Sequence, residues 1–598
     1  MCQMNRMRKA SSLWLGVLGV LVLWLSIPAH VLAASQPAAP SAQGRIIKTY
    51  NEGKKLRGQE AVKFADEFLA LANDPKLLPR DKVFALEWGI YFCNCNKKID
   101  GACAKAHEIF EAYRRDLVGK SPTSEKKLVY AYVSEILGAE LAKDGNRLGE
   151  FLKVIDENEK TLNFGPDKVC ADLCRGQLYL SAREWEKATG LLEGYVASST
   201  TPDPQVYGDI SQAYLALKRP QEAVAALTAG MKRFEADPTS IKKLTPMLRY
   251  VDESQVVDIL PYCVRDGATA DSVLAGIAQR TLQSGNVNGA LAYAKLCYST
   301  APIEGSTAAM ELVAKCLTAV DMDPTKATQF LQFQKYGVAG EDGKVGTADD
   351  CRDDLASIPN PLPAHVTAAL EDRLKGMIPA AGSIYTILRD RGAIYLVMGK
   401  SKEALRSFRS AYDAASIAEV KEGSALVPRA LKSLDGTVVR ANAYLLYQKH
   451  GPNGPDGQRG TADDINDPLA DDILPELPQD VQNALLAITA NKAQTVAAYQ
   501  QRGFAWLALG EYEKGLDQLR GAFVFAAQGK GQAEAIEGIA AAIKAFDGHV
   551  LRANQYLLFQ SHGANGPDKK LGTEDDLANP FPAILKEIKK TEAARVGA

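Results

Sequence analysis

Residues 444–468 read YLLYQKHGPNGPDGQRGTADDINDP, and residues 556–580 read YLLFQSHGANGPDKKLGTEDDLANP. A more diverged copy, FLQFQKYGVAGEDGKVGTADDCRDDL, occupies residues 330–355. The copies begin at residues 330, 444 and 556, so they start 114 and 112 residues apart. Similarity at a nearly fixed spacing is typical of proteins built from stacked structural repeats. The C-terminal half of the chain is therefore predicted to be a repeat array.

The first part of each copy has the pattern of a helix. Val439, Ala443, Leu446 and Tyr447 fall on one helical stripe, and Gly451 follows a basic last turn, as at a helix C-terminus. The third copy repeats this pattern with Leu551, Gln555, Leu558, Phe559 and Gly563. We expect a helix that ends at a glycine in each copy.

The second part of each copy is rich in glycine and aspartate. We call residues 337–359, 451–468 and 563–580 the Gly/Asp loops; each of them ends on a proline. About twenty residues is long for a connection between helices, and such loops are commonly functional. The oxygen-bearing side chains that we predict as candidate metal ligands are Asp342, Asp349, Asp350, Asp456, Thr461, Asp463, Asp464, Asp568, Asp575 and Asp576.

We call the recurring Asp, Gly and Thr positions of each loop its frame. Calcium is the cation that this frame favours. Ca²⁺ takes six to eight carboxylate and carbonyl oxygens, and Gly457 and Gly460 permit the tight backbone that turns several oxygens inward. The loops resemble the Asp/Gly calcium loops of secreted bacterial repeat proteins, and they lack the spacing of an EF-hand. Two alternatives stay open: a metal-free loop capped by its own Asp and Thr side chains, or a direct contact with a ligand or partner. Lys569 stands where the other copies have glycine and weakens the case for metal in the third loop.

Helical hairpins precede the loops. The pattern is clearest at Leu388, Gly392, Tyr395, Gly399, Ala404, Phe408 and Ala411. Small residues at positions 392 and 404 let two helices cross closely, while Tyr395 and Phe408 fill the space around the crossing. The pattern resembles the tetratricopeptide repeat (TPR). That resemblance implies an all-α fold, a TPR-like right-handed α-solenoid with three long Gly/Asp-rich inter-repeat loops.

The N-terminus has the features of an export signal. Basic residues precede an apolar run at residues 13–27, and a small-residue cleavage site follows near Ala33. We expect a signal peptide at residues 1–33 and a flexible leader at 34–44. Further along, we expect an N-terminal helical region at 45–165, TPR-like repeats at 166–300 and large repeats at 301–598. We expect the exported protein to reside in the periplasm or at the cell surface.

Composition narrows the function. A formal net charge of −2 argues against a nucleic-acid groove, and no later apolar run is long enough to span a membrane. Cleavage of the signal leaves nine of the ten cysteines, which allows disulfides between hairpins, buried thiols or, less favoured, zinc. No nucleophile, metallohydrolase or phosphate-binding motif occurs.

The sequence therefore predicts an exported, non-catalytic scaffold that binds a protein or peptide partner in a concave TPR groove, with calcium as the candidate cofactor. One alternative is a calcium-dependent structural or cell-surface protein whose loops are the working part. Another is an enzyme, or an enzyme accessory, with its site in the solenoid groove.

Overall fold

The computed structural model describes residues 41–165, 170–234, 237–250, 253–264, 268–526, 530–570, 573 and 576–597. These residues form helices and their connections, without a β-strand among them, which confirms the all-α class. The expected signal peptide lies outside the described residues. The first described helix begins at Ala42, inside the leader expected at 34–44, because the Ser41 hydroxyl accepts a hydrogen bond from the Gly44 amide and caps it.

The chain divides into two compact units, one up to Val251 and one from Asp252. The first unit contains short helices followed by helical hairpins. Its helices are α3 (Ala42–Gly53), α4 (Gly58–Phe64), α5 (Asp66–Asn73), α6 (Pro79–Cys95), α7 (Ala102–Asp116), α8 (Pro122–Ala131), α9 (Gly138–Leu141), α10 (Leu148–Glu157), α11 (Glu159–Leu162), α12 (Ala171–Ser181), α13 (Trp185–Ser198), α14 (Pro204–Ala216), α15 (Pro220–Arg233) and α16 (Pro238–Leu244). A π-helical turn, Tyr132–Leu137, joins α8 to α9, and 3₁₀ turns occupy Gly145–Arg147 and Thr245–Tyr250.

The core of the first unit forms around α6. Its middle residues are almost all buried, and Gly89 faces Phe68 and Ile109 so closely that a Cβ would lie 3.0 Å from each side chain. Phe110 stacks on Tyr132 with ring centroids 3.8 Å apart. A continuous apolar cluster therefore runs from the first helices of this unit into α12.

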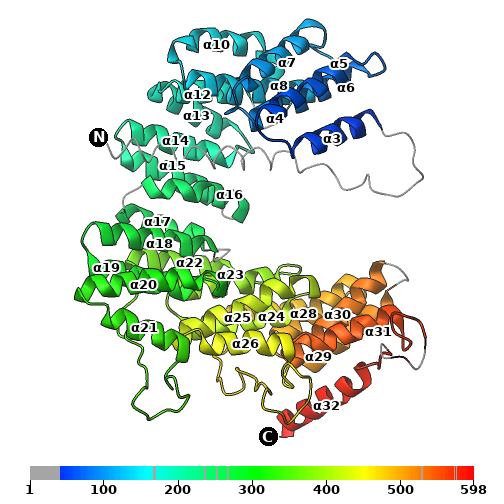
Figure 1. Ribbon diagram of the computed structural model, residues 1–598. Coiled ribbons are helices and arrows are strands. Elements are labelled where there is room, and N and C mark those ends of the chain that lie inside the picture. Colours follow the sequence, from blue (N-terminus) through cyan, green and yellow to red (C-terminus); the bar gives the residue numbers. More distant parts are fainter. Residues whose placement is uncertain are drawn as a thin grey trace. The chain divides into compact units, whose positions relative to one another are not determined.

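Among its described residues, the second unit has one helix followed by three consecutive sets of five α-helices; Figure 1 shows most of them. Helix α17 (Glu253–Cys263) precedes them. Repeat one contains α18 (Ala268–Gln283), α19 (Val287–Thr300), α20 (Ser306–Asp321), α21 (Thr325–Tyr336) and α22 (Ala364–Gly376). Repeat two contains α23 (Ile384–Val397), α24 (Ser401–Ala414), α25 (Val420–Asp435), α26 (Val439–His450) and α27 (Gln479–Thr489). Repeat three contains α28 (Val496–Ala508), α29 (Tyr512–Phe525), α30 (Lys530–Asp547), α31 (Leu551–His562) and α32 (Phe581–Gly597).

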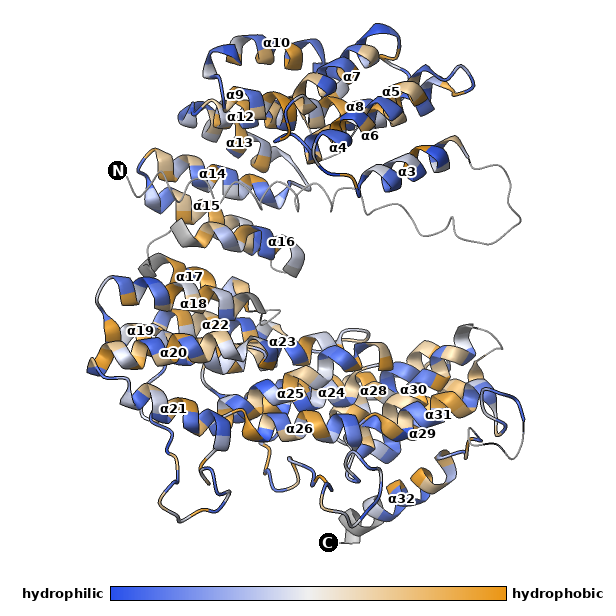
Figure 2. Ribbon diagram, in the orientation of Figure 1, coloured by the Kyte–Doolittle hydropathy of each residue, from blue (hydrophilic) through white to orange (hydrophobic). Residues whose placement is uncertain are grey.

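Helices α18 and α19 pack together as α23 and α24 do, so we group them as the first hairpin of repeat one. From the sequence we expected the large repeats at 301–598, and that boundary stays a prediction. Most helices of both units carry separate hydrophilic and hydrophobic stripes, as partly buried helices do (Figure 2).

The expected close crossing of helices is present in repeat two. A Cβ on Gly392 would lie 2.4 Å from the Phe408 ring, so α23 and α24 approach at a distance that only glycine allows. The Gly503 position in repeat three meets Leu519 in the same way, at 2.5 Å. Gly399 and Gly510, which turn the chain between the two helices, have positive φ angles of 74° and 82°.

Successive repeats meet through the same pair of contacts. The second helix of one repeat packs on the first and third helices of the next, α19 on α23 and α25, and α24 on α28 and α30. In both joints a buried lysine from the third helix reaches the C-terminus of the preceding second helix. The Lys432 ammonium donates to the carbonyls of Tyr298 and Ala301, and the Lys544 ammonium donates to those of Tyr412 and Ala415.

A buried glutamine adds a second link at each joint. Gln334 accepts a hydrogen bond from the Tyr298 hydroxyl and donates to the Gly436 carbonyl of the next repeat at 2.6 Å. Gln448 likewise accepts from the Tyr412 hydroxyl at 2.7 Å and donates to the Gly548 carbonyl. The polar groups at a joint are thus satisfied only when the following repeat is in place.

Candidate functional site

The candidate site is the Gly/Asp loop, which begins where the fourth helix of each repeat ends. The predicted terminal glycines are confirmed: Gly337, Gly451 and Gly563 follow α21, α26 and α31 with φ near +70° and ψ near −160°. Residues with a side chain are almost excluded from this backbone region, so glycine is required there. The loops after α21 and α26 project from the same edge of the second unit (Figure 1).

The loop of repeat one is closed by its own carboxylates. Asp349 Oδ2 accepts the Asp342 amide at 2.9 Å, and Asp350 Oδ2 accepts the Gly346 amide at 2.8 Å. Asp342 Oδ1 accepts the Lys344 amide at 2.8 Å. Each predicted ligand of this loop therefore also orders the loop backbone, as an Asx turn does.

The loop of repeat two has the same hydrogen bonds. Asp463 Oδ2 accepts the Asp456 amide at 2.9 Å, and Asp464 Oδ2 accepts the Gly460 amide at 2.7 Å. Gly454 approaches the Asp463 carbonyl so closely that a Cβ would lie 1.9 Å from its oxygen. Two sequences that share little beyond the Asp, Gly and Thr frame therefore fold into one conformation.

A threonine lies at the centre of each frame, among several oxygens. The Thr347 hydroxyl lies 2.8 Å from Asp349 Oδ1, 3.3 Å from Asp342 Oδ1, 3.4 Å from Asp350 Oδ1 and 3.0 Å from the Lys344 carbonyl. One hydroxyl carries one proton and can donate to only one of these acceptors. Of the other oxygens, Asp342 Oδ1 accepts the Lys344 amide.

Thr461 repeats this arrangement in the second loop. Its hydroxyl lies 2.8 Å from Asp463 Oδ1, 3.4 Å from Asp456 Oδ1 and 3.1 Å from the Gln458 carbonyl. Backbone amides and the threonine hydroxyl lower the pKa of Asp349 and of Asp463, with the amides of Asp342 and Asp456 the largest causes. Both frames are thus negatively charged and exposed.

The described residues of the third loop repeat some of these contacts. Asp568 Oδ1 accepts the Lys570 amide at 2.7 Å and lies 3.4 Å from the Thr573 hydroxyl. Lys569 adopts a left-handed conformation with φ of 61°, where the other loops have Gly343 and Gly457. The Asp576 amide donates to the Thr573 carbonyl at 3.2 Å, whereas Asp575 lies outside the described residues.

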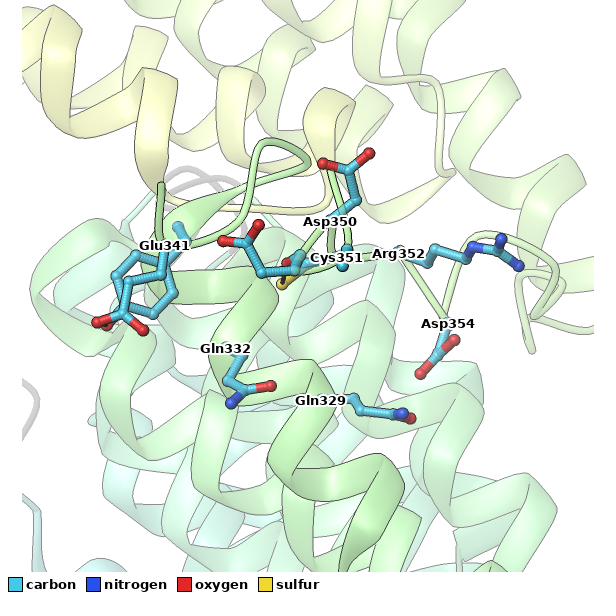
Figure 3. Close-up of a pocket in the computed structure, with 10 residues that line it drawn as sticks. Gln329, Gln332, Glu341, Asp350, Cys351, Arg352 and Asp354 are labelled. Carbon is cyan, nitrogen blue, oxygen red and sulfur yellow. Dashed lines mark hydrogen bonds between the residues drawn. The ribbon is translucent and has the colours of Figure 1, made fainter. Parts of the chain in front are cut away.

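A polar hollow of about 520 Å³ lies between α21 and the first loop (Figure 3). Gln329 and Gln332 border it from the helix, and Asp349, Asp350 and Asp354 border it from the loop. Figure 3 shows Glu341 at one end of this hollow and Asp354 at the other, so these two acids do not meet at one point. Within the described part of the chain, no group of three or more His, Cys, Asp or Glu residues is arranged to hold a metal ion.

The second half of the first loop and the four residues after it form a strap, residues 351–363, that continues onto repeat two. The Asn360 amide group donates to the Val397 carbonyl at the end of α23 at 3.0 Å, and Leu355 is buried. Lys295 of α19 donates to the Ile358 carbonyl at 2.6 Å. The loop therefore has an exposed turn and a strap that connects two repeats.

The joint residues are the part that sequence reasoning missed. Gln334, Gln448 and Gln560 recur at the same place in the repeated helix, and Lys432 recurs as Lys544. That recurrence was a signal, because a polar residue retained on a helical stripe of apolar residues indicates a buried partner.

The nine cysteines of the described residues are free thiols.

No protein-family model matches this sequence, and no curated protein is similar to it. Among the helices that the structure describes, none combines the length and the apolar character that crossing a membrane requires.

Proposed function

We propose that this chain is an exported, non-catalytic scaffold, a TPR-like right-handed α-solenoid whose concave groove binds a protein or peptide partner. The observation that carries this proposal is the recurrence of one joint, with its lysine and its glutamine, between repeats one and two and between repeats two and three. Repeats that contact mainly their neighbours build extended surfaces, and such surfaces bind extended partners.

Exposed leucines at the repeat spacing support a partner-binding role. Leu446 of α26 and Leu558 of α31 occupy the same position in consecutive repeats, and their exposed fractions are 50% and 46%. An extended peptide contacts a helical array through apolar side chains placed at regular intervals. These leucines are the part of the surface whose replacement tests the proposal.

Peptides selected by phage display on the immobilised full chain test the partner. We expect selected peptides to share a pattern of apolar residues, and L446D/L558D to weaken their binding about tenfold or more. Leu78→Asp is the matched control, since Leu78 is equally exposed but lies in the first unit. Selection of no peptide, or unchanged affinity in L446D/L558D, argues against this surface.

Calcium in the Gly/Asp loops is the second part of the proposal. It is supported by the several carboxylate and carbonyl oxygens that lie within 3.4 Å of the hydroxyls of Thr347 and Thr461. A cation among these oxygens would stiffen the loop, and through the strap of repeat one it would stiffen the joint with repeat two. The metal-free capped loop is the alternative, and the amide-to-carboxylate hydrogen bonds support it.

Calorimetric titration of the full chain with calcium, after chelator treatment, decides between these two forms. We expect saturable binding and a higher melting temperature, because a ligand of the folded state stabilises it by mass action, by ~2.7 kcal/mol at one hundred times Kd. The triple variant D456A/D463A/D464A should lose one of the bound ions. An unchanged melting temperature at millimolar calcium would leave the loops as metal-free capped turns.

A further inference from the structure

A cavity of about 250 Å³ lies at the joint between repeats one and two. Lys295 and Ser299 of α19 border one side, and Ser401 of α24 and Ser433 of α25 border the other. Met398 and the proline-rich part of the strap complete its wall. Unlike the acidic hollow beside the first loop, this cavity has no aspartate or glutamate in its lining.

At the equivalent positions of the joint between repeats two and three there is an ion pair. Arg409 stands at the position of Lys295, and Asp413 stands at the position of Ser299. The Arg409 guanidinium lies 3.1 Å from Asp413 Oδ1, and the Tyr512 hydroxyl donates to Asp413 Oδ2 at 3.2 Å. Tyr512 stands at the position of Ser401. At this joint the buried Asp413 carboxylate is therefore held by Arg409 from its own helix and by the Tyr512 hydroxyl from the next repeat.

The joint between repeats one and two keeps the cation as Lys295, and it has Ser299 in place of the carboxylate and Ser401 in place of the large ring. The resulting cavity offers hydrogen-bond donors without an acidic acceptor. The Lys295 ammonium uses one of its three protons on the Ile358 carbonyl. The Ser299 hydroxyl has no hydrogen-bond partner among the described residues, and the hydroxyls of Ser401 and Ser433 lie 2.8 Å apart.

The electrostatics of the cavity favour an anion. Asp353 is the acid that acts on Lys295, and it does not border the cavity. Burial lowers the pKa of Lys295, and an anion beside the ammonium would oppose this shift. Ser401 is the first residue of α24, so the positive end of this helix dipole faces the same side.

We propose that this cavity binds a small organic acid, with its carboxylate between Lys295 and Ser401, where Asp413 places its carboxylate in the next joint. The remaining volume takes a short substituent beside Met398, and Ser433 is placed to bind a hydroxyl on it. This small-molecule site goes beyond the proposed scaffold function and requires neither calcium in the loops nor a bound partner.

Isothermal titration of the full chain with acetate, lactate and succinate, in a buffer free of carboxylates, tests the site. We expect saturable binding of at least one of these acids and none of lactamide, which has the shape of lactate without its charge. Lys295→Met should weaken binding about tenfold or more, the effect expected for a hydrogen bond to a charged group. Lys315→Met, on the exposed face of α20, should leave binding unchanged.

Ser299→Asp is the sharpest variant, because it rebuilds the internal carboxylate of the next joint. We expect S299D to keep the helical circular dichroism signal and to lose binding of the acid, since its own carboxylate occupies the site. The inference is overturned if none of the three acids binds saturably, or if K295M binds as the natural chain does. It is also overturned if a folded S299D still binds, or if inorganic phosphate binds as tightly as the best of the three acids.

Discussion

Lys432 and Lys544 are single residues on which a joint between repeats depends. Each ammonium is buried and donates to carbonyls at the C-terminus of a helix in the preceding repeat, where the helix dipole favours a cation. Burial outweighs this attraction and lowers the pKa of both lysines to about 7. Arg429 lowers the pKa of Lys432 further, and Asp413 opposes the effect at Lys544.

This shift predicts how stability depends on pH. Between pH 7 and the pKa of an unfolded lysine near 10.4, the unfolded chain binds a proton that the folded chain does not. The free energy of unfolding should therefore rise with pH in this window, by ~2 kcal/mol per lysine between pH 7 and pH 9. Urea unfolding of the natural chain and of K432M/K544M, followed by circular dichroism, measures the difference between their slopes.

A control separates this effect from other titrating groups. Lys402→Met removes an exposed lysine of α24 and should keep the slope of the natural chain. Equal slopes in the natural chain and in K432M/K544M would mean that both lysines stay charged in the folded protein.

At the scale of the element, the fourth helix of each repeat has two tasks. Its C-terminal glycine starts the Gly/Asp loop, and its glutamine connects the repeat to the next one. Gln448 is buried because the Gly548 turn of repeat three covers it, whereas Gln560 is exposed. We therefore expect Gln448 to contribute more to the free energy of unfolding than Gln560, although both occupy the same position in the repeated helix.

This difference gives a matched pair of variants. Gln448→Met leaves the Tyr412 hydroxyl and the Gly548 carbonyl buried without a partner, so it should lower the free energy of unfolding by ~2 kcal/mol. Gln560→Met makes the same substitution at the exposed position and should change it by less than ~0.5 kcal/mol. Urea unfolding measures the free energy of unfolding of both variants. A loss at Gln448 as small as the loss at Gln560 would show that the inter-repeat hydrogen bonds add no stability.

At the scale of the whole molecule, the array needs an end. Helix α32 follows the third loop and covers repeat three: Ile584 and Ile588 are buried in one apolar cluster with Leu516, Leu519 and Tyr556. This helix spans Phe581–Gly597. Val524 and Phe525 of α29 stay exposed at this end of the chain.

Disrupting the packing of α32 should destabilise repeat three, at the C-terminal end of the second unit. Ile584→Asp places a charge in the apolar cluster and should destabilise repeat three by ~3 kcal/mol or more. Hydrogen exchange should quicken in α29, α30 and α31 and stay unchanged in α12 and α13 of the first unit. Ala583→Asp adds the same charge at an exposed position of α32 and serves as control. Uniform acceleration throughout the second unit would contradict an end-capping role.

Local signals were sufficient for much of the fold. Glycines 337, 451 and 563 end their helices as the pattern predicted, and Gly392 meets Phe408 as the hairpin pattern required. These features depend on backbone geometry and on side chains a few residues apart. Helices α18 and α19 pack as a hairpin, although they keep less of the sequence pattern than α23 and α24 do.

The sequence by itself determined the helices, their glycine-bounded ends, the repeat spacing and the Asp–Gly–Thr frame of the loops, since each follows from local conformational preference and periodicity. Only the tertiary structure decided which polar residues meet between repeats. Lys432 contacts a helix end 131 residues away, at Ala301, and Lys295 and Ser401 meet at one cavity across a joint. Such contacts depend on how whole helices pack. The partners of a buried charged residue can therefore be identified only when that packing is known.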